Sequence, residues 1–332
     1  MSRKVFVDTG SRLHLGLIDL TGDLGRIDGG IGIYVRQPRI LLGARPLQRL
    51  STNRYNELAE YAVEKLNFHY KENLGLELDF AEAYDQHVGL GSTTQILLAI
   101  SAAYNALYRK EASPRQMAEV LSRGGTSGIG VAGFEKGGFI FDGGHTFGPG
   151  KDKSTFLPSR VSQCPPAPAL FQHPLPSDWR IDIIVPRSSS GLSGTPEVDF
   201  FQDNCPIPAV ETASICRVIV SVILPAVKEA DIKSFNQGIN TLTTLGFKKR
   251  EIDNQTSQVN QIINDIRSIT AMNAGISLSS FGPTVCVITK AMNIHRWGQR
   301  LLGYLEELCE SNTYDHYVTE SRNVGGQVRI EH

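Results

Sequence analysis

The sequence predicts an α+β fold made of two domains. Its 332 residues exceed what a single hydrophobic core usually holds. Helical and strand patterns are grouped in each half without regular β-α alternation, which favours α+β over a doubly wound sheet. Residues 158–177 are rich in proline and lack apolar periodicity, as expected of a connection. We therefore expect an N-terminal domain at 1–157 and a C-terminal domain at 178–332.

The composition is that of an ordinary globular protein, with 41% hydrophobic and 20% charged residues. With 33 Lys+Arg against 34 Asp+Glu, the net charge of −1 provides no global attraction to nucleic acid or to an anionic membrane. The N-terminus has no apolar leader segment, and no apolar run nears the roughly 20 residues that span a bilayer, so we expect a cytoplasmic protein. The 5 cysteines form no C-x-x-C pair and are expected to be reduced thiols.

Periodicity places the elements of the N-terminal half. Apolar residues that alternate or run together predict strands at 5–8, 12–18, 25–35, 76–80 and 139–141. Helical spacing of apolar residues predicts helices at 53–67 and 95–108. A third helix begins at Pro114, with Ser113 as its cap, and the glycines of 124–130 open a short fourth helix.

The C-terminal half is predicted to hold more helix. A strand at 179–185 precedes a polar loop at 188–194. Helices are expected at 209–229, interrupted near Pro225, and at 232–245, 257–270 and 294–309. Strands are expected at 285–288, 314–319 and 327–330.

A glycine-rich turn at 87–95 runs into the nearly uncharged second helix, and this junction is typical of an anion site. Gly89 and Gly91 permit backbone angles at which successive N–H groups converge on one cluster of oxygens. The helix adds its positive N-terminal end, and Ser92, Thr93 and Thr94 add hydroxyl groups that reach a phosphate or its metal. The alternative is a plain tight turn with a Ser or Thr cap. The pattern is neither a P-loop nor a dinucleotide-binding fingerprint.

Polar residues also gather at a glycine-dense bend near the N-terminus. They are Arg12, His14, Asp19, Arg26 and Asp28. Arginine binds planar oxyanions with two hydrogen bonds and aspartate binds hard cations, so this set suits a site for phosphate, carboxylate and metal. The alternative is a surface hairpin with exposed charges. For His14, which alternates with leucines, the alternative is a histidine on the strand face opposite a core.

Three glycine-rich stretches, at 10–35, 87–95 and 279–288, resemble in order and position the three motifs of the GHMP small-molecule kinases. The central stretch is similar to the Pro-x-x-x-Gly-Leu-Gly-Ser-Ser-Ala loop of that family, with Thr93 and Thr94 replacing the later Ser and Ala. The resemblance implies a phosphate-loop N-terminal domain, a ferredoxin-like C-terminal domain and a site in the cleft between them. It also implies substrate or phosphate binding by Arg12, His14, Gly89, Gly91, Ser92, Thr93, Thr94, Arg123, Gly125, Thr126, Ser127, Gly282 and Thr284.

One position departs from the kinase pattern. Many kinases of the family carry Ser-Gly-x-Asp, whose Asp acts as base toward the substrate hydroxyl. The segment 127–130 here places Gly130 where that base belongs. Because glycine accepts no proton, this departure weakens the alternative that the protein is an ATP-dependent small-molecule kinase. A second alternative is a ligand-binding member of the fold without catalytic activity.

The segments 12–20, 25–32 and 124–132 resemble in detail the β-ribofuranosylaminobenzene 5′-phosphate synthase family of methanopterin biosynthesis. That resemblance implies condensation of phosphoribosyl pyrophosphate with 4-aminobenzoate or 4-hydroxybenzoate, with release of CO₂ and pyrophosphate. It implies Mg²⁺ and no organic cofactor. We expect Asp19, Asp28 and Arg26 at the reacting centre and Ser92 and Asp19 as metal ligands. We also expect a homodimer that acts on small molecules.

Overall fold

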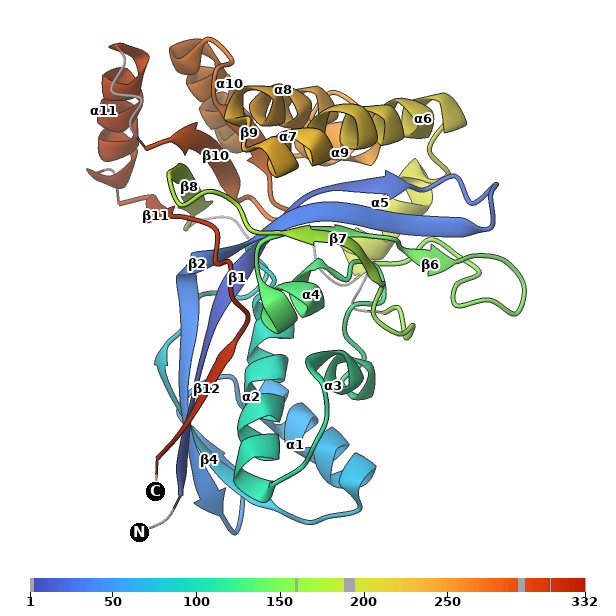
Figure 1. Cartoon of the computed structure of the whole chain (residues 1–332), viewed down its shortest axis with the longest axis vertical. Helices are drawn as coiled ribbons and strands as arrows, with labels where there is room; N and C mark the ends of the chain where they lie inside the picture. Colours follow the sequence, from blue (N-terminus) through green and yellow to red (C-terminus); the bar gives the residue numbers. More distant parts are fainter. Residues whose placement is uncertain (1–2, 159–160, 188–194, 292–295, 311, 332) are drawn as a thin grey trace.

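The computed structural model describes residues 3–158, 161–187, 195–291, 296–310 and 312–331. Within this part of the chain the strands form an eight-stranded and a four-stranded sheet (Figure 1). The larger sheet has the order β12-β1-β2-β4-β3, with β5 and β6 paired to β2 and β7 paired to β5. Its strands are β1 (Lys4–Asp19), β2 (Arg26–Leu47), β3 (Ser51–Thr52), β4 (Gly75–Glu82), β5 (Phe139–Asp142), β6 (His145–Thr146), β7 (Ala169–His173) and β12 (Gln327–Glu331).

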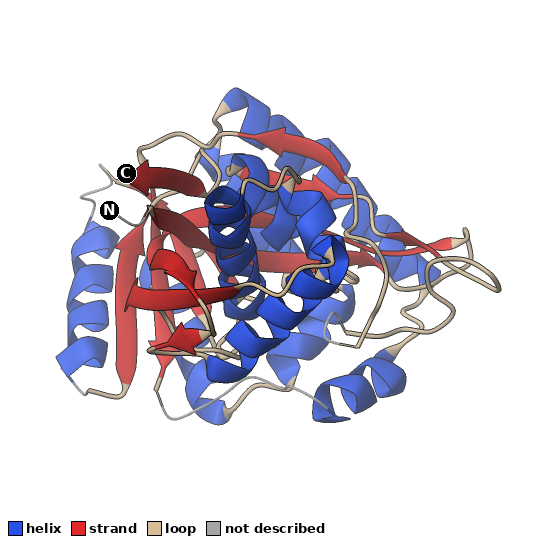
Figure 2. Cartoon of the chain, turned by 90° about the horizontal axis from the view of Figure 1, so that it is seen from below, coloured by secondary structure: helices blue, strands red, loops and turns tan. Residues whose placement is uncertain are grey.

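Helices of the N-terminal half cover one face of the larger sheet (Figures 1 and 2). They are α1 (Asn56–Tyr70), α2 (Ser92–Tyr108), α3 (Pro114–Val120) and α4 (Ile129–Lys136). α2 and α4 pack on β1 and β2, and α1 and α3 pack against α2. α2 lacks charge because most of its side chains are buried between the sheet and the outer helices. Ser113 caps α3 as predicted, and it forms a capping box with Gln116.

The smaller sheet is antiparallel, with the order β11-β8-β10-β9. Its strands are β8 (Trp179–Pro186), β9 (Gly275–Leu278), β10 (Val285–Lys290) and β11 (Tyr314–Thr319). The helices of this half are α5 (Thr195–Asn204), α6 (Ala209–Val218), α7 (Leu224–Glu229), α8 (Ile232–Leu242), α9 (Gly246–Asp253), α10 (Ser257–Thr270) and α11 (Arg296–Glu310). Helices join β8 to β9 and β10 to β11, which is the predicted ferredoxin-like arrangement.

The two halves share a hydrophobic core. Buried side chains of α2 and the larger sheet belong to the same cluster as Trp179 of β8 and Phe235 of α8. The Phe139 ring on β5 lies edge-on to the Phe235 ring, with the ring centroids 6.0 Å apart. A second apolar cluster joins Leu17 of β1 to α5 and α9. The cleft between the halves is therefore held by packing on both sides.

The structure corrects four sequence predictions for the strands. The strand expected at 25–35 is β2, which runs on to Leu47. β1 is one strand of 16 residues, not two short ones, and bulges at 9–11 and 14–16 interrupt the apolar alternation that marks a strand. The connection 158–177 contains β7, which its flanking prolines concealed. The final strand, β12, pairs with β1, so the end of the predicted C-terminal domain belongs to the N-terminal sheet. The polar loop predicted at 188–194 lies outside the described residues.

The apolar segment Ala209–Glu229 is helical throughout, with a π-helical stretch Ile219–Ile223 before Pro225. By length and composition it is a candidate membrane span, contrary to the statement that no apolar run nears that length. In the most apolar 18-residue stretch of this segment, 33% of the residues are buried. The segment packs against α8. One such helix is also typical of a core helix in a globular protein. The 5 cysteines are free thiols, as predicted.

Candidate active site

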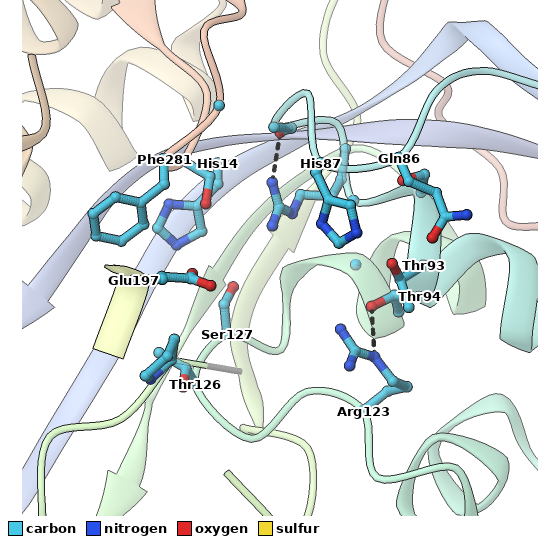
Figure 3. A pocket seen from close by; sticks show the side chains of 18 of the residues that line it. His14, Gln86, His87, Thr93, Thr94, Arg123, Thr126, Ser127, Glu197 and Phe281 are labelled. Carbon is cyan, nitrogen blue, oxygen red and sulfur yellow. Dashed lines mark hydrogen bonds between the residues drawn. The ribbon is translucent and has the colours of Figure 1, made fainter. Parts of the chain in front are cut away.

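A cavity of about 710 Å³ lies where β1, the start of α2 and the C-terminal half meet (Figure 3). The predicted residues that line it are Arg12, His14, Gly89, Gly91, Ser92, Thr93, Thr94, Arg123, Thr126, Ser127 and Gly282. The predicted residues that do not line it are Asp19, Arg26, Asp28, Gly125 and Thr284. The structure thus gathers at one place all but two of the residues expected to bind substrate or phosphate, and it leaves the three expected catalytic residues outside the cavity.

The glycine loop (residues 87–91) leads directly into α2 at one end of the cavity, which we call the loop end. Gly89 and Gly91 have φ angles of 95° and 74°, in the region that glycine adopts without strain. Gly91 is the N-cap of α2, and no side chain caps the helix. The first turn contains no acidic residue. The N–H groups and the positive helix end are therefore available to an anion in the cavity.

Two arginines flank the loop end. The half-buried Arg12 side chain donates from Nη1 to the Gly89 carbonyl at 2.8 Å, and its backbone N–H donates to the Leu90 carbonyl at 3.0 Å. Burial lowers the pKa of Arg12 to about 10, so the guanidinium keeps its charge at neutral pH. On the other side of the α2 terminus, Arg123 Nε donates to Thr94 Oγ1 at 3.2 Å. The loop end is therefore a local cationic site in a protein of nearly zero net charge.

The serine turn (residues 279–284) holds the glycine loop from behind. Ser279 Oγ donates to the Gly89 carbonyl at 2.7 Å, and Thr284 Oγ1 donates to the Val88 carbonyl at 2.5 Å. A Cβ at Gly282 would lie 2.2 Å from the Val88 carbonyl oxygen, so only glycine permits this approach. Thr284 supports the loop rather than the cavity wall. The third glycine-rich motif therefore positions the second one.

The N-terminal end of α4 forms the wall opposite the serine turn. Ser127 Oγ and the backbone N–H of Gly128 donate to the buried Asp142 carboxylate at 3.4 and 3.0 Å. These bonds orient the segment that places Thr126 and Ser127 at the cavity. Gly125 does not face the cavity, because a Cβ there would lie 2.8 Å from the Ser162 hydroxyl.

Gly130 faces the cavity, at the position where the related kinases carry their base. A Cβ at Gly130 would lie 3.4 Å from Thr94 Cγ2 and 3.7 Å from Arg12 Cγ. The Gly130 carbonyl accepts from Gln95 Nε2 at 2.9 Å, which fixes α4 against α2. The residue at this point of the wall carries no carboxylate. The aliphatic part of the Arg12 side chain lies next to it instead.

Asp28 is buried behind the cavity wall. Its Oδ2 accepts from Lys153 Nζ at 2.9 Å and lies 2.7 Å from His145 Nδ1. Lys153 Nζ also donates to Thr126 Oγ1 at 3.2 Å and to the Leu157 carbonyl at 3.0 Å. Within the part of the chain that the structure describes, Asp28 is joined to the cavity through Lys153 and Thr126. This is the position of a supporting residue and not of a group that contacts substrate.

Asp19 and Arg26 lie where the β1–β2 hairpin extends beyond the cavity. Asp19 accepts from the hydroxyl and the backbone N–H of Thr21, each at 2.8 Å. Arg26 donates to the carbonyls of Gly143 and Gly144 at 2.8 and 3.0 Å. Asp19 and Arg26 flank the turn between β1 and β2, whereas the β1 residues that line the cavity, Arg12, His14 and Leu17, lie before that turn. The described residues contain no group of three or more His, Cys, Asp or Glu that is placed to hold a metal.

The opposite end of the cavity, which we call the aromatic end, was missed by the sequence analysis. Its apolar wall consists of Leu17, Phe201 and Phe281. The Phe201 and Phe281 rings lie with their centroids 5.5 Å apart. Phe201 belongs to α5, which no sequence pattern predicted, and Phe281 sits within the serine turn. Only the fold brings these rings together, so no local signal identifies them.

Two carboxylates and a histidine stand beside these rings. Glu197 of α5 and Glu251 of α9 line the cavity. Burial raises the pKa of Glu251, which is nevertheless paired with the buried Lys248. The spacing of Lys248 and Glu251 is that of an exposed helical ion pair, so the sequence did not mark it as part of a site.

His14 projects from β1 into the aromatic end, between Phe281 and Glu197 (Figure 3). Its ring is buried, and within the described residues its Nδ1 has no hydrogen-bond partner. Burial first, and then the charges of Arg12 and Lys248, hold the pKa of His14 well below its usual value. The imidazole is therefore neutral at physiological pH and retains a nitrogen lone pair that can accept a proton.

Comparisons with known proteins agree with this geometry. A family model described as GHMP kinases N terminal domain matches residues 56–138. The chain is 38% identical over 328 residues to a protein of Archaeoglobus fulgidus named β-ribofuranosylphenol 5′-phosphate synthase, covering 97% of this chain and 98% of that protein. A protein of the same name from Methanocaldococcus jannaschii is 37% identical over 300 residues, covering 85% of this chain and 88% of that protein.

The solved structures that resemble this chain share its fold at low sequence identity. A homoserine kinase from Cytophaga hutchinsonii matches with a TM-score of 0.62 and 14% identity, covering 99% of this chain and 98% of that one. A mevalonate diphosphate decarboxylase from Staphylococcus aureus matches with a TM-score of 0.59 and 12% identity, covering 99% and 98% of the two chains. The predicted α+β, GHMP-kinase-like fold is thus confirmed.

Proposed function

Because this chain belongs to the β-ribofuranosylphenol 5′-phosphate synthase family, we propose that it joins the phosphoribosyl group of phosphoribosyl pyrophosphate to an aromatic ring. The second substrate is 4-hydroxybenzoate or 4-aminobenzoate, and the products are the C-riboside 5′-phosphate, CO₂ and pyrophosphate. The relatives are named for a phenol product and not for the aminobenzene that we inferred from the sequence. Replacing the carboxyl group of 4-hydroxybenzoate by a ribosyl group gives such a phenol, which favours this acid.

The observation that carries the proposal is a cavity with an anion site at one end and aromatic rings at the other. The uncapped start of α2, Arg12 and Arg123 suit the pyrophosphate group. The rings of Phe201 and Phe281 suit a benzoate ring. The wall at Gly130 lacks the base that transfer of a phosphoryl group to an alcohol would use. The kinase alternative is therefore not favoured.

The reaction needs no hydroxyl activation on a sugar or alcohol. The C–O bond between the anomeric carbon and pyrophosphate breaks, and the N–H groups and guanidinium groups at the loop end stabilise the charge of the departing group. The ring carbon that bears the carboxylate is electron-rich, because it lies para to the hydroxyl or amino group, and it attacks the anomeric carbon. The bond to the carboxylate then breaks, and the released electron pair restores the aromatic ring as CO₂ leaves.

We propose that Mg²⁺ enters as a complex with phosphoribosyl pyrophosphate. Mg²⁺ usually keeps several waters and binds through substrate phosphates and one or two protein oxygens. Of the two ligands that the sequence analysis named, Ser92 lines the cavity and Asp19 does not. Removal of divalent cations by a chelator should abolish turnover, and added Mg²⁺ should restore it. The proposal requires no organic cofactor.

The decisive assay measures labelled CO₂ from carboxyl-labelled 4-hydroxybenzoate, with and without phosphoribosyl pyrophosphate. We expect release that depends on both substrates, and inorganic pyrophosphate should inhibit competitively against phosphoribosyl pyrophosphate. Release of ADP from ATP in the presence of a small alcohol, without CO₂ release, would support the kinase alternative and overturn the proposal. Binding of the substrates without turnover of either kind would support a non-catalytic member of the fold.

We further propose that the protein works in the cytoplasm as a homodimer. Val210 and Val220, on the apolar segment Ala209–Glu229, are 73% and 58% exposed, which leaves apolar surface for a second copy to cover. Light scattering coupled to size exclusion should give twice the monomer mass of 36.4 kDa. Replacement of both valines by serine should shift the protein toward the monomer.

A further inference from the structure

The aromatic end contains a buried, neutral histidine that the reaction described above does not yet use. His14 lines the cavity beside Phe281, and its Nδ1 has no hydrogen-bond partner within the described residues. An unpaired polar atom in a buried site costs free energy, and such atoms persist where a ligand completes them. The His14 ring lines the part of the cavity where, under the proposed function, the aromatic acid binds.

The reaction itself fixes which way the aromatic acid lies. The ring carbon that bears the carboxylate must face the anomeric carbon, and the pyrophosphate on that carbon occupies the loop end. The para substituent of the ring therefore points to the aromatic end. The charges agree, because Arg123 at the loop end attracts the carboxylate of the acid, whereas Glu197 stands beside the aromatic end (Figure 3).

His14 is suited to accept a proton from a para hydroxyl group. The charged groups around it are Arg12 on its own strand, Lys248 and Glu251 on α9, and Glu197 on α5. Lys248 and Glu251 form an ion pair with each other. The neutral ring offers a lone pair where a charged ring would offer none.

We propose that His14 is the general base and acid for the 4-hydroxyl group, which makes it the residue that adapts this site to a phenol. The inference rests on the proposed function. As the ring carbon forms its bond to the anomeric carbon and pyrophosphate leaves, the hydroxyl proton moves to His14 and the ring becomes a dienone. The bond to the carboxylate then breaks, CO₂ leaves, and the electron pair regenerates a phenolate. That phenolate takes the proton back from His14, so the enzyme ends as it began.

The proposal predicts a difference between two acids of nearly the same shape. A phenol must lose its proton to push a full electron pair into the ring, whereas the amino nitrogen of 4-aminobenzoate supplies its lone pair without losing one. General base catalysis typically contributes about 10²-fold to 10⁴-fold to a rate. His14→Gln should therefore lower turnover of 4-hydroxybenzoate by about 10²-fold or more and that of 4-aminobenzoate by less than about 10-fold.

A matched control is His87→Gln, which alters a histidine on the glycine loop at the far end of the same cavity. It should change turnover of the two acids by the same factor. The His14→Gln enzyme should also regain activity with 4-hydroxybenzoate as the pH approaches the pKa of a free phenol, about 10, because the substrate then arrives ionised. A merely structural role of His14 would produce neither the selectivity nor this recovery.

The wild-type enzyme provides a test that does not depend on the folding of a variant. 4-Methoxybenzoate has no proton to give, so it should bind competitively with 4-hydroxybenzoate and release no CO₂. Equal losses with both acids in His14→Gln, or turnover of 4-methoxybenzoate at a rate near that of 4-hydroxybenzoate, would overturn the role of His14. Absence of CO₂ release from wild-type enzyme with both natural acids would instead overturn the proposed function.

Discussion

At the scale of single residues, one glycine separates this site from that of the related kinases. Gly130 faces the cavity, and the nearest side chains are Thr94, Gln95 and Arg12. The sequence identified this position by its place in a motif. The structure shows in addition that a carboxylate here would lie beside the Arg12 side chain, whose positive charge the anionic substrate is expected to use.

We predict that Gly130→Asp weakens binding of phosphoribosyl pyrophosphate by at least about 10-fold, because the new carboxylate repels the pyrophosphate and competes for Arg12. It should not create phosphoryl transfer to an alcohol. A Cβ at this position makes only ordinary contacts, so the chain should fold. Gly130→Asn is the control for bulk and should weaken binding less. Equal affinities of the two variants, measured by calorimetry, would show that charge at this position does not matter.

The buried Asp142 carboxyl group makes the free energy of unfolding depend on pH. Burial raises its pKa to about 7, although N–H donors from Gly144 and Gly128 act to lower it. In the unfolded chain an Asp has a pKa near 4. Between these values the folded protein binds more protons than the unfolded chain, so the contribution of Asp142 to the free energy of unfolding falls as the pH rises from about 4 to about 7.

We therefore predict that Asp142→Asn removes this pH dependence. Relative to wild type, the variant should gain about 2 kcal/mol in the free energy of unfolding between pH 5 and pH 8. Urea unfolding at several pH values measures this difference. Parallel curves for the two proteins would mean that the Asp142 carboxyl titrates in the folded state as it does in water.

At the residue scale, the sequence predicted the phosphate-binding groups better than the reacting centre. Gly91 and Thr94 lie within one short motif, so their proximity follows from local backbone geometry. Asp28 and His14 lie on paired strands, where a bulge at 14–16 decides which face each side chain takes. A pattern of polar residues does not reveal such a bulge. The expected catalytic Asp28 is therefore buried behind the wall, and His14 lies in the cavity.

At the scale of elements, the serine turn and the glycine loop behave as one unit. The hydroxyl groups of Ser279 and Thr284 hold carbonyls of the loop, and Gly282 permits the two backbones to touch. Ser279 and Gly89 are 190 residues apart in the chain. The geometry of the anion site therefore depends on correct docking of that half.

We predict that Gly282→Ala lowers the free energy of unfolding by about 1–3 kcal/mol, because its Cβ would meet backbone atoms that cannot move aside. The glycine loop should shift, and the Michaelis constant for phosphoribosyl pyrophosphate should rise. Gly303→Ala is the matched control, because a Cβ there meets no atom within 4 Å. Wild-type stability and kinetics for Gly282→Ala would show that the loop is not held by this turn.

Helices and strands were predicted correctly where apolar periodicity and turn residues indicate the same bounds, and they were missed where the sequence pattern resembles a loop. α10 and β11 have the predicted bounds, since each shows clear periodicity between turn residues. α9 was missed, because its charged segment resembles a solvated loop and its buried pair Lys248–Glu251 is satisfied only within the fold. Both missed helices, α5 and α9, contribute to the aromatic end. The part of the site that sequence analysis could not find is the part that long-range packing builds.

At the scale of the whole molecule, the chain ends by completing the sheet in which it begins. β12 pairs along β1, with Lys4 opposite Glu331 and Asp8 opposite Gln327. Arg322 reaches Asp8 with a 2.7 Å ion pair just before this strand. The N-terminal sheet is thus not a product of the N-terminal half alone.

We predict that removal of residues 327–332 lowers the melting temperature and promotes aggregation, because β1 becomes an unprotected edge strand. Val328→Thr is the control, since it keeps the backbone pairing and changes only an exposed side chain. Thermal unfolding and dynamic light scattering measure the two effects. A truncated protein that stays monodisperse and as stable as wild type would show that β12 contributes nothing to the sheet.

The pairing of β1 with β12 also determines how the protein folds. Among the described strands that pair, β1 and β12 lie farthest apart in the sequence, so their ladder carries the largest loop-closure cost of these pairings and forms late. The two chain ends lie side by side (Figure 1). A circular permutant that joins them by a short linker and opens elsewhere would turn the most distant contact into a local hairpin, and it should refold faster than the natural order of the chain.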